Sequence, residues 1–271
     1  MLNFPALGRV FYGLSIAGLG FLTLYYRDFP YFLIPPHSHI APWAAIVISI
    51  TGTLLCLAGI SIVSKMNGGL VSLLLGGVLL LNFIVYFIPY QIMFSTNSRQ
   101  FGDWENAAKV LALAGGAWII TGSLSNEKER GKEKISQKIF NAGRALYATI
   151  IVSFSMDHFL YAKNAVDYVP RWIPGHLFWI YFCGIALACS GVAILFQIKM
   201  KLAATLLGAM ILVWVIILHI PYVVAASSPE ERAGESASAL LALAYCGTAL
   251  SIAGFSFKES VNQEPSLRIT P

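Results

Sequence analysis

Eight apolar runs of about 20 residues each are the feature that most limits what this chain can fold into. A helix of about 20 residues is needed to cross roughly 30 Å of hydrocarbon, and only helices and closed barrels satisfy their backbone groups in lipid. With 57% hydrophobic and 11% charged residues, the composition is far from that of a soluble domain. We therefore predict an all-α membrane protein with eight transmembrane helices, at residues 9–26, 42–63, 70–93, 105–123, 143–163, 175–197, 201–224 and 237–257.

The positions of the basic residues predict how the chain is oriented. With eight spans, both termini and the even-numbered loops lie on one side, and that side holds 12 of the 18 Lys and Arg residues. The positive-inside rule then places both termini in the cytoplasm, and we expect a multi-pass protein of a cell inner membrane. Because the net charge of +5 is explained by these loops, we expect the lipid bilayer and no nucleic acid as a partner. The remaining six basic residues are Arg27, Arg99, Lys109, Lys163, Arg171 and Arg232.

The two halves of the chain repeat one pattern. A shift of 132 residues aligns 42–122 with 174–254 without a gap, and a shift of 135 matches Arg9 and Tyr12 with Arg144 and Tyr147. An even number of helices per unit predicts two parallel-oriented four-helix repeats, side by side. We divide the chain into a first unit at 1–123, a charged cytoplasmic linker at 124–143, a second unit at 144–257 and a polar tail at 258–271. The shift of 132 pairs Pro42 with Pro174, Gly52 with Gly184, Gly59 with Gly191, Gly76 with Gly208, Ile88-Pro89-Tyr90 with Ile220-Pro221-Tyr222, Gly115 with Gly247 and Gly122 with Gly254.

Paired glycines and prolines predict details of the packing. The glycines in the second and fourth helices of each unit are seven residues apart, so each pair lies on one face where another backbone can approach. We expect the tight seam at these helices. Pro89 and Pro221 should kink or end the third helices.

Polar residues gather at the outer end of the second unit. Asp157 and His158 lie in an apolar helix, His219 lies at a similar depth, and His176 opens the next helix. Ionisable groups inside a membrane are costly, so these side chains should pair with one another or face a wet cavity. The expected partner of Asp157 or His158 is His219, with Arg171 as a further one. Arg171 and Trp172 would form a lid over the group.

Two interpretations of this polar group stay open. The first is a structural clasp, in which a buried hydrogen bond joins two helices. The second is a proton relay or a site for a quinone headgroup or another small polar molecule, because imidazole titrates near neutrality. The first unit carries Phe87 in place of His219, and Leu22-Thr23 or Tyr25-Tyr26 in place of the Asp-His pair. Any site is therefore single.

The sequence assigns no catalytic residue, metal site or disulfide. His37 and His39 are two residues apart, but no Cys or third His lies near them in the sequence, which is too few ligands for a metal. All four cysteines fall within predicted spans, so no disulfide framework is expected.

The second unit resembles the DoxX-like membrane proteins, which are built from one such four-helix unit. The resemblance spans about 144–254 and is carried by the pair His158-Phe159, the VPRWIP segment at 169–174, the small-residue pattern at 184–195 and a basic residue before a helix that ends near IPY. The third helices depart from the family by ending in HIPY and FIPY instead of an asparagine-bearing sequence, and the doubling is not the common architecture. Some relatives are linked to thiosulfate:quinone oxidoreductase or to complexes with redox partners.

The resemblance implies a membrane subunit of a quinone-linked redox system, with soluble or membrane redox proteins as partners and quinone as the candidate cofactor. Any enzymatic role would be that of an oxidoreductase subunit and not of a self-sufficient enzyme. Two other classes remain as alternatives: a small-molecule transporter that uses the repeats as two rocking halves, and a non-catalytic scaffold that recruits soluble proteins through 124–143.

Overall fold

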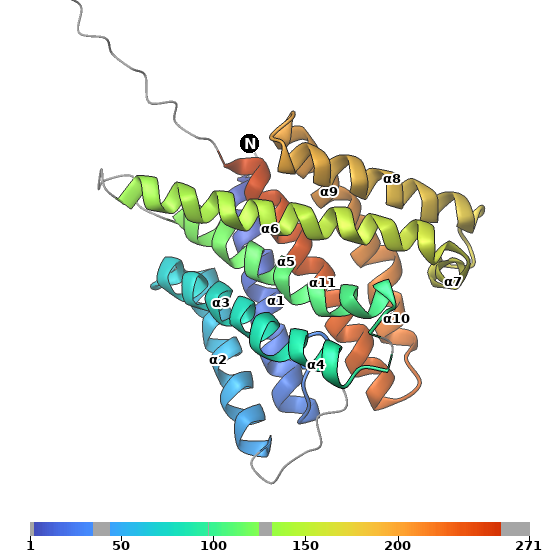
Figure 1. The fold of residues 1–271 in the computed structure, drawn as a ribbon, viewed down its shortest axis with the longest axis horizontal. Helices are drawn as coiled ribbons and strands as arrows, with labels where there is room; N and C mark the ends of the chain where they lie inside the picture. Colours follow the sequence, from blue (N-terminus) through green and yellow to red (C-terminus); the bar gives the residue numbers. More distant parts are fainter. Residues whose placement is uncertain (1–2, 35–43, 97, 125–131, 256–271) are drawn as a thin grey trace, which may run out of the picture.

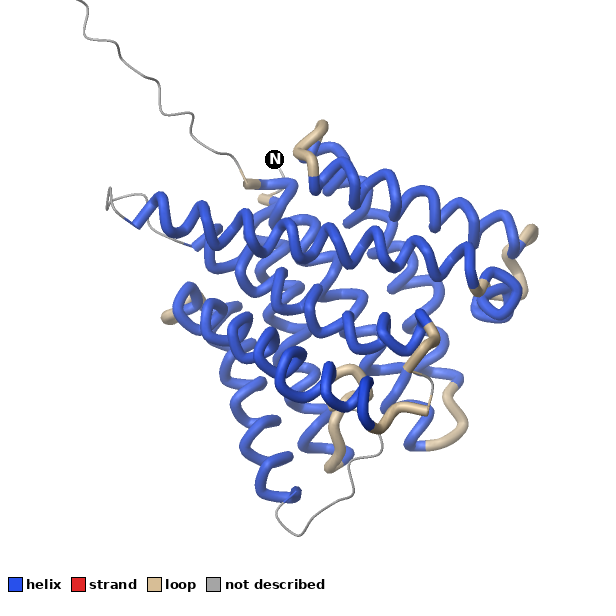
Figure 2. Tube along the Cα trace, viewed as in Figure 1, coloured by secondary structure: helices blue, strands red, loops and turns tan. Residues whose placement is uncertain are grey.

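The computed structural model describes residues 3–34, 44–96, 98–124 and 132–255, and over these ranges the regular structure is helical, without strands (Figures 1 and 2). Eight helical stretches are long and apolar enough to cross a membrane, which confirms the predicted fold class. They are α1 (Phe4–Tyr26), α2 (Ala44–Ser64), α3 with α4 (Gly68–Met93), α5 (Phe101–Leu124), α6 (Lys132–Leu160), α8 (His176–Leu195), α9 with α10 (Met200–Ala225) and α11 (Pro229–Gly254).

Several helices begin earlier than hydropathy predicts, because their first turns are charged. α11 begins at Pro229, where the Ser228 hydroxyl accepts a hydrogen bond from the Glu231 amide at 3.1 Å, and the Glu231 carboxylate accepts one from the Ser227 amide at 2.7 Å. This capping arrangement starts a helix without apolar residues. α6 likewise begins at Lys132, inside the predicted linker. Residues 125–131 of that linker, the whole predicted tail at 258–271, and His37 and His39 lie outside the described residues.

The helices of the two halves correspond at the predicted offset. α3 begins at Gly68 and α9 at Met200, and a π-helical turn follows each of them, at Phe83–Phe87 and Val215–His219. Tertiary hydrogen bonds repeat as well. The Tyr12 hydroxyl donates to the Leu113 carbonyl at 2.6 Å, and the Tyr147 hydroxyl donates to the Tyr245 carbonyl at 2.9 Å. The same tyrosine hydrogen bond thus joins the first helix to the fourth helix within each unit.

Two buried arginines perform a matching role at the cytoplasmic ends predicted for the helices. Arg9 donates to the carbonyl oxygen of Ile62 at 2.8 Å and also to that of Val63. Arg144 donates to the Ile194 and Leu195 carbonyls in the same way. The last carbonyls of a helix lack intrahelical donors and carry partial negative charge. Each guanidinium therefore caps the end of the second helix of its unit, and this accounts for a buried cation.

Pro89 and Pro221 do not end the third helices. Each proline lies in the second position of the short helix after the π turn, α4 (Ile88–Met93) or α10 (Ile220–Ala225). Proline lacks an amide proton and its ring collides with the carbonyl one turn earlier. A wider π turn, with one extra residue, relieves this collision and allows the helix to continue. Of the kink or end predicted at these prolines, the end is wrong, because each helix continues through a π turn.

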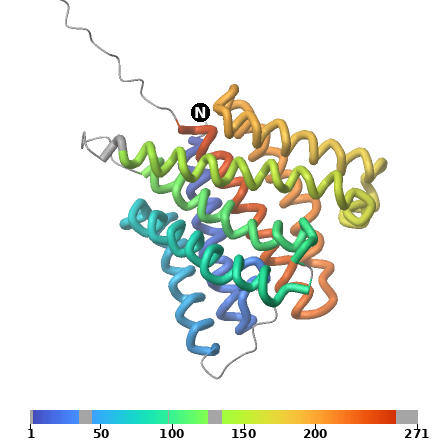
Figure 3. The backbone as a smooth tube through the Cα atoms, viewed as in Figure 1, coloured from blue at the N-terminus to red at the C-terminus, as the bar shows by residue number. Residues whose placement is uncertain are grey.

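The seam between the units joins the fourth helix of one unit to the first helix of the other. A Cβ added to Gly115 in α5 would lie 2.7 Å from the Gly143 carbonyl oxygen in α6, and one added to Gly247 in α11 would lie 2.6 Å from the Gly8 carbonyl oxygen in α1. Figure 3 shows α1 and α11, at the blue and red ends of the colour scale, crossing at the centre. These distances leave no room for a side chain, so the backbones are in direct contact.

The glycines of the second helices pack within their own unit and not at the seam. A Cβ at Gly59 would lie 2.4 Å from the Gly13 carbonyl oxygen of α1, and one at Gly191 would lie 3.1 Å from the Ala148 carbonyl oxygen of α6. The predicted seam was therefore right for the fourth helices and wrong for the second. The most apolar windows of α5 and α11 are 67% buried, against 22–33% for the second and third helices. The fourth helices form the centre, and the second and third helices present apolar faces outward.

Gly115→Ala and Gly247→Ala should each destabilise the protein by about 1–3 kcal/mol, because overpacking forces the two backbones apart. Gly77→Ala is the matched control, since nothing lies within 4 Å of a Cβ at this helical glycine, and it should change stability by less than about 1 kcal/mol. The thermal unfolding midpoint in detergent measures the difference. Equal midpoints for all three variants would contradict the seam.

Candidate functional site

A cavity of about 480 Å³ lies within the second unit. Its wall comes from α6, α8, α9 with its π turn, and α11, together with Lys109 from α5 and Tyr31 from the segment after α1. Most of the wall is apolar or aromatic. The lining residues include Tyr31, Lys109, Phe154, Asp157, His158, Tyr168, Val169, Trp179, Cys183, Trp214, His219, Ser238 and Tyr245.

Three of the six predicted site residues border this cavity. Asp157, His158 and His219 line it, and His176, Arg171 and Trp172 do not. His176 is the first residue of α8 and is half-buried. Of the polar group predicted for the second unit, only the residues on α6 and on the π turn therefore meet at the cavity.

The wall formed by the 162–173 segment is apolar, unlike the predicted lid. Val169 and Ile173 are buried and pack in one cluster with Trp179 and Trp214, whereas the Trp172 side chain is 72% exposed. Tyr168 and Val169 border the cavity. Arg171 and Trp172 of the VPRWIP segment are exposed, Val169 borders the cavity, and Ile173 packs in the cluster beside it.

The segment is also anchored to the third helix of the unit. The Tyr222 hydroxyl of α10 donates to the Asp167 carbonyl in the 3-10 turn Val166–Tyr168 at 3.0 Å. Tyr222 and Tyr168 rings also lie near each other, with centroids 6.2 Å apart. The turn that supplies Tyr168 to the cavity is thus fixed by the tyrosine of the repeated Ile-Pro-Tyr triplet.

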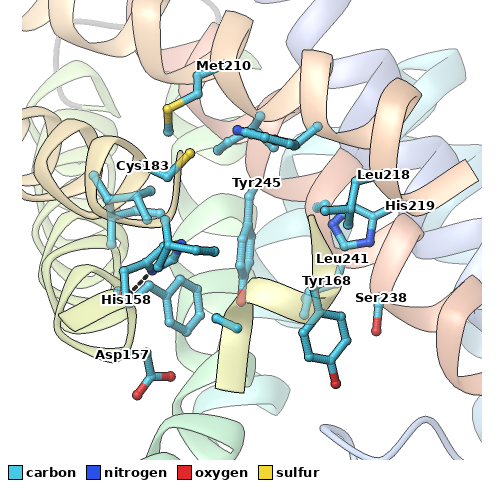
Figure 4. A pocket seen from close by; sticks show the side chains of 18 of the residues that line it. Asp157, His158, Tyr168, Cys183, Met210, Leu218, His219, Ser238, Leu241 and Tyr245 are labelled. Atoms are coloured by element: carbon cyan, nitrogen blue, oxygen red, sulfur yellow. Dashed lines mark hydrogen bonds between the residues drawn. The ribbon is translucent and has the colours of Figure 1, made fainter. Parts of the chain in front are cut away.

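The two histidines do not bond to each other. His158 Nδ1 lies 2.8 Å from the Phe154 carbonyl of its own helix, and His219 Nδ1 is buried without a hydrogen-bond partner among the described residues. In the view of Figure 4 the Tyr245 ring stands between His158 and His219. The predicted clasp between the two helices is therefore wrong, and His158 Nε2 is left for other partners.

Asp157 instead meets an acid from the first unit. Its side chain lies within hydrogen-bonding reach of Glu105 on α5, and among the described residues no donor is bonded to Asp157 Oδ1 or to either Glu105 carboxyl oxygen. Glu105 is 2% exposed. Glu105 was not among the predicted site residues, because it stands at the predicted start of its span, where a charged residue indicates the membrane interface.

A short polar network continues from this pair along the edge of the cavity. Lys109 Nζ donates to the Tyr31 hydroxyl at 3.1 Å and to Asn106 Oδ1 at 2.6 Å, and it lies 4.8 Å from the Tyr31 ring centre. The Tyr31 and Ser238 hydroxyls lie 3.4 Å apart. The Tyr245 hydroxyl donates to the Lys109 carbonyl at 2.9 Å. The spacing of four residues between Glu105 and Lys109 was the sequence signal that both face one side of a buried helix.

The corresponding positions of the first unit carry different side chains. Phe87, at the position of His219, is 3% exposed and belongs to the same core cluster as Phe32 and Leu33. Asn82, at the position of Trp214, donates to the Leu33 carbonyl at 2.9 Å. The described part of the segment after α1, up to residue 34, is thus bonded to the third helix of the first unit.

The chemistry of the cavity is that of an amphipathic ligand site. Apolar walls with a few polar groups at defined points are typical of small-molecule pockets. Trp179 and Trp214 meet edge to face, with ring centres 6.3 Å apart, and offer flat surfaces to a ring. Over the described ranges no three His, Cys, Asp or Glu side chains come together in a way that would hold a metal ion.

Comparisons with family models, with curated proteins and with solved structures gave no match. The role of the cavity must therefore be argued from its residues.

Ile173→Ala should destabilise the protein by about 2–5 kcal/mol, the range for removing a buried aliphatic side chain. Trp172→Ala should change stability by less than about 0.5 kcal/mol, as expected for an exposed position. Thermal unfolding midpoints of the two variants in detergent provide the measurement. A larger loss of stability in Trp172→Ala than in Ile173→Ala would support the predicted lid.

Proposed function

We propose that this protein binds a quinone, or a closely related lipid-soluble ring compound, in the cavity of its second unit. The observation that carries the proposal is the cavity of about 480 Å³ with aromatic walls and two histidines on opposite sides of Tyr245. The ring of such a ligand would pack against Trp179 and Trp214, since offset stacking of flat rings adds to the burial of apolar surface.

The polar groups of the cavity suit the two carbonyl oxygens of a quinone. A neutral imidazole offers one donor and one acceptor nitrogen. His158 uses Nδ1 on its own helix, which leaves Nε2 for a ligand. His219 has no bonded partner through Nδ1, so a donor or acceptor on a ligand, or a change of its side-chain rotamer, would satisfy a group that costs about 1–3 kcal/mol when it is left unpaired.

The wider setting of the proposal is a membrane subunit of a quinone-linked redox system, as the resemblance to DoxX-like proteins implies. The corresponding helices and hydrogen bonds of the two halves support an internal duplication of such a unit. The excess of basic residues on the side of the termini supports an inner-membrane protein with both termini in the cytoplasm. Partner proteins would supply or accept the electrons.

Cys183→Phe should weaken binding of a short-chain quinone by tenfold or more, which corresponds to about 1.4 kcal/mol, because the added ring would occupy the cavity. Cys189→Phe is the matched control, since Cys189 lies on the same helix but is exposed. Quinones quench tryptophan fluorescence, and Trp179 and Trp214 line the cavity, so quenching in detergent reports the affinity.

His219→Ala provides a second test that adds no bulk. It should weaken quinone binding while the thermal unfolding midpoint stays near that of the wild type, because it removes an unpartnered group. Equal affinity of the wild type and of folded Cys183→Phe would place any bound quinone outside the cavity and overturn the proposal.

A further inference from the structure

A buried and a half-buried carboxyl group from different units meet beside the cavity. Glu105 belongs to α5 of the first unit and Asp157 to α6 of the second. Their side chains lie within hydrogen-bonding reach, and neither Glu105 oxygen nor Asp157 Oδ1 has a donor from any other described residue. An unpartnered carboxylate in an apolar interior is among the most costly groups that a protein can bury.

The surrounding groups neutralise this pair only in part. Lys109 lies one turn beyond Glu105 and attracts its carboxylate, but its ammonium group donates to Tyr31 and Asn106. From α11, the Tyr245 hydroxyl lies near Glu105, yet it donates a hydrogen bond to the Lys109 carbonyl. From α6, His158 is bonded to its own helix. Among the described residues, no donor therefore bonds to either Glu105 oxygen or to Asp157 Oδ1.

A carboxylate accepts hydrogen bonds but cannot donate one, so two carboxylates in contact repel each other. One added proton converts this repulsion into a charge-assisted hydrogen bond between acid and carboxylate, among the stronger hydrogen bonds in proteins. We propose that Glu105 and Asp157 together bind one proton and hold it at the seam between the units.

The position of the pair makes it a proton-exchange site for the cavity. Asp157 borders the cavity, and Glu105 lies four residues from the start of α5, about 6 Å along the helix from its outer end. A proton can thus pass between the outer surface and a ligand through the two carboxyl groups. This last step rests on the proposed quinone site, whereas the binding of a proton does not.

Infrared difference spectroscopy of the purified full-length protein without ligand tests the pair directly. A protonated carboxylic acid has a C=O stretching band that shifts in heavy water and that carboxylates lack. The wild type should show this band near neutral pH and lose it as the pH is raised. Glu105→Gln and Asp157→Asn should each abolish it, because the new amide then donates to the remaining carboxylate.

Glu230→Gln is the control, since Glu230 is an exposed acid on α11, and it should leave the band unchanged. Both amide variants should keep an unfolding midpoint close to that of the wild type. A band that survives in either variant would show that the proton belongs to one acid alone and would overturn the shared site. A missing band, with a midpoint that rises with sodium concentration, would show a bound cation instead and would also overturn it.

Normal quinone binding together with loss of the band in Glu105→Gln would separate the two functions. Quinone binding would fail in Cys183→Phe while the band is retained, so the failure of one proposal is distinguishable from the failure of the other.

Discussion

Direct contact between helix backbones is the constraint on which the rest of this structure depends. In lipid there is little hydrophobic drive for one helix to pack on another, so close van der Waals packing must hold the helices together. The facing glycines Gly8 with Gly247 and Gly115 with Gly143 permit that packing at two matching places. Because each fourth helix is clamped at the seam, its outer half stands fixed beside the first helix of the other unit, and this placement brings Glu105 against Asp157.

The same framework is used differently in its two halves. Helix-capping arginines, tyrosine hydrogen bonds and π turns occur in both units. In the first unit Phe87 is buried in the core cluster, and in the second unit the corresponding His219 lines the cavity. The cavity therefore arises from side-chain substitution on a common backbone and requires no change in the course of the helices.

The sequence predicted the eight helices and their offset well, because apolar length and repeated glycines and prolines are local signals. It predicted Asp157, His158 and His219 as one group because ionisable residues are rare at that depth. It could not predict that His158 bonds Phe154 in its own helix, since a histidine on a helix has local as well as distant partners. Glu105 was missed because its burial depends on how α5 packs against α6, which no local pattern reveals. The lid assigned to Arg171 and Trp172 was wrong for the same reason, since exposure in a turn is decided by the turn's anchoring.

At the seam the first helix of each unit pairs with the fourth helix of the other. This pairing has a consequence for how such a chain could arise and diverge. Each unit carries both surfaces of the seam, a first helix and a fourth helix with facing glycines, so one unit alone has the shape needed to pair with a copy of itself about a twofold axis. The present chain is then equivalent to a dimer whose subunits are covalently joined. Joining removes the requirement that both halves stay identical. Glu105 of one half can then meet Asp157 of the other at one place only, because the position that corresponds to Glu105 at the offset of 132 is Ala237.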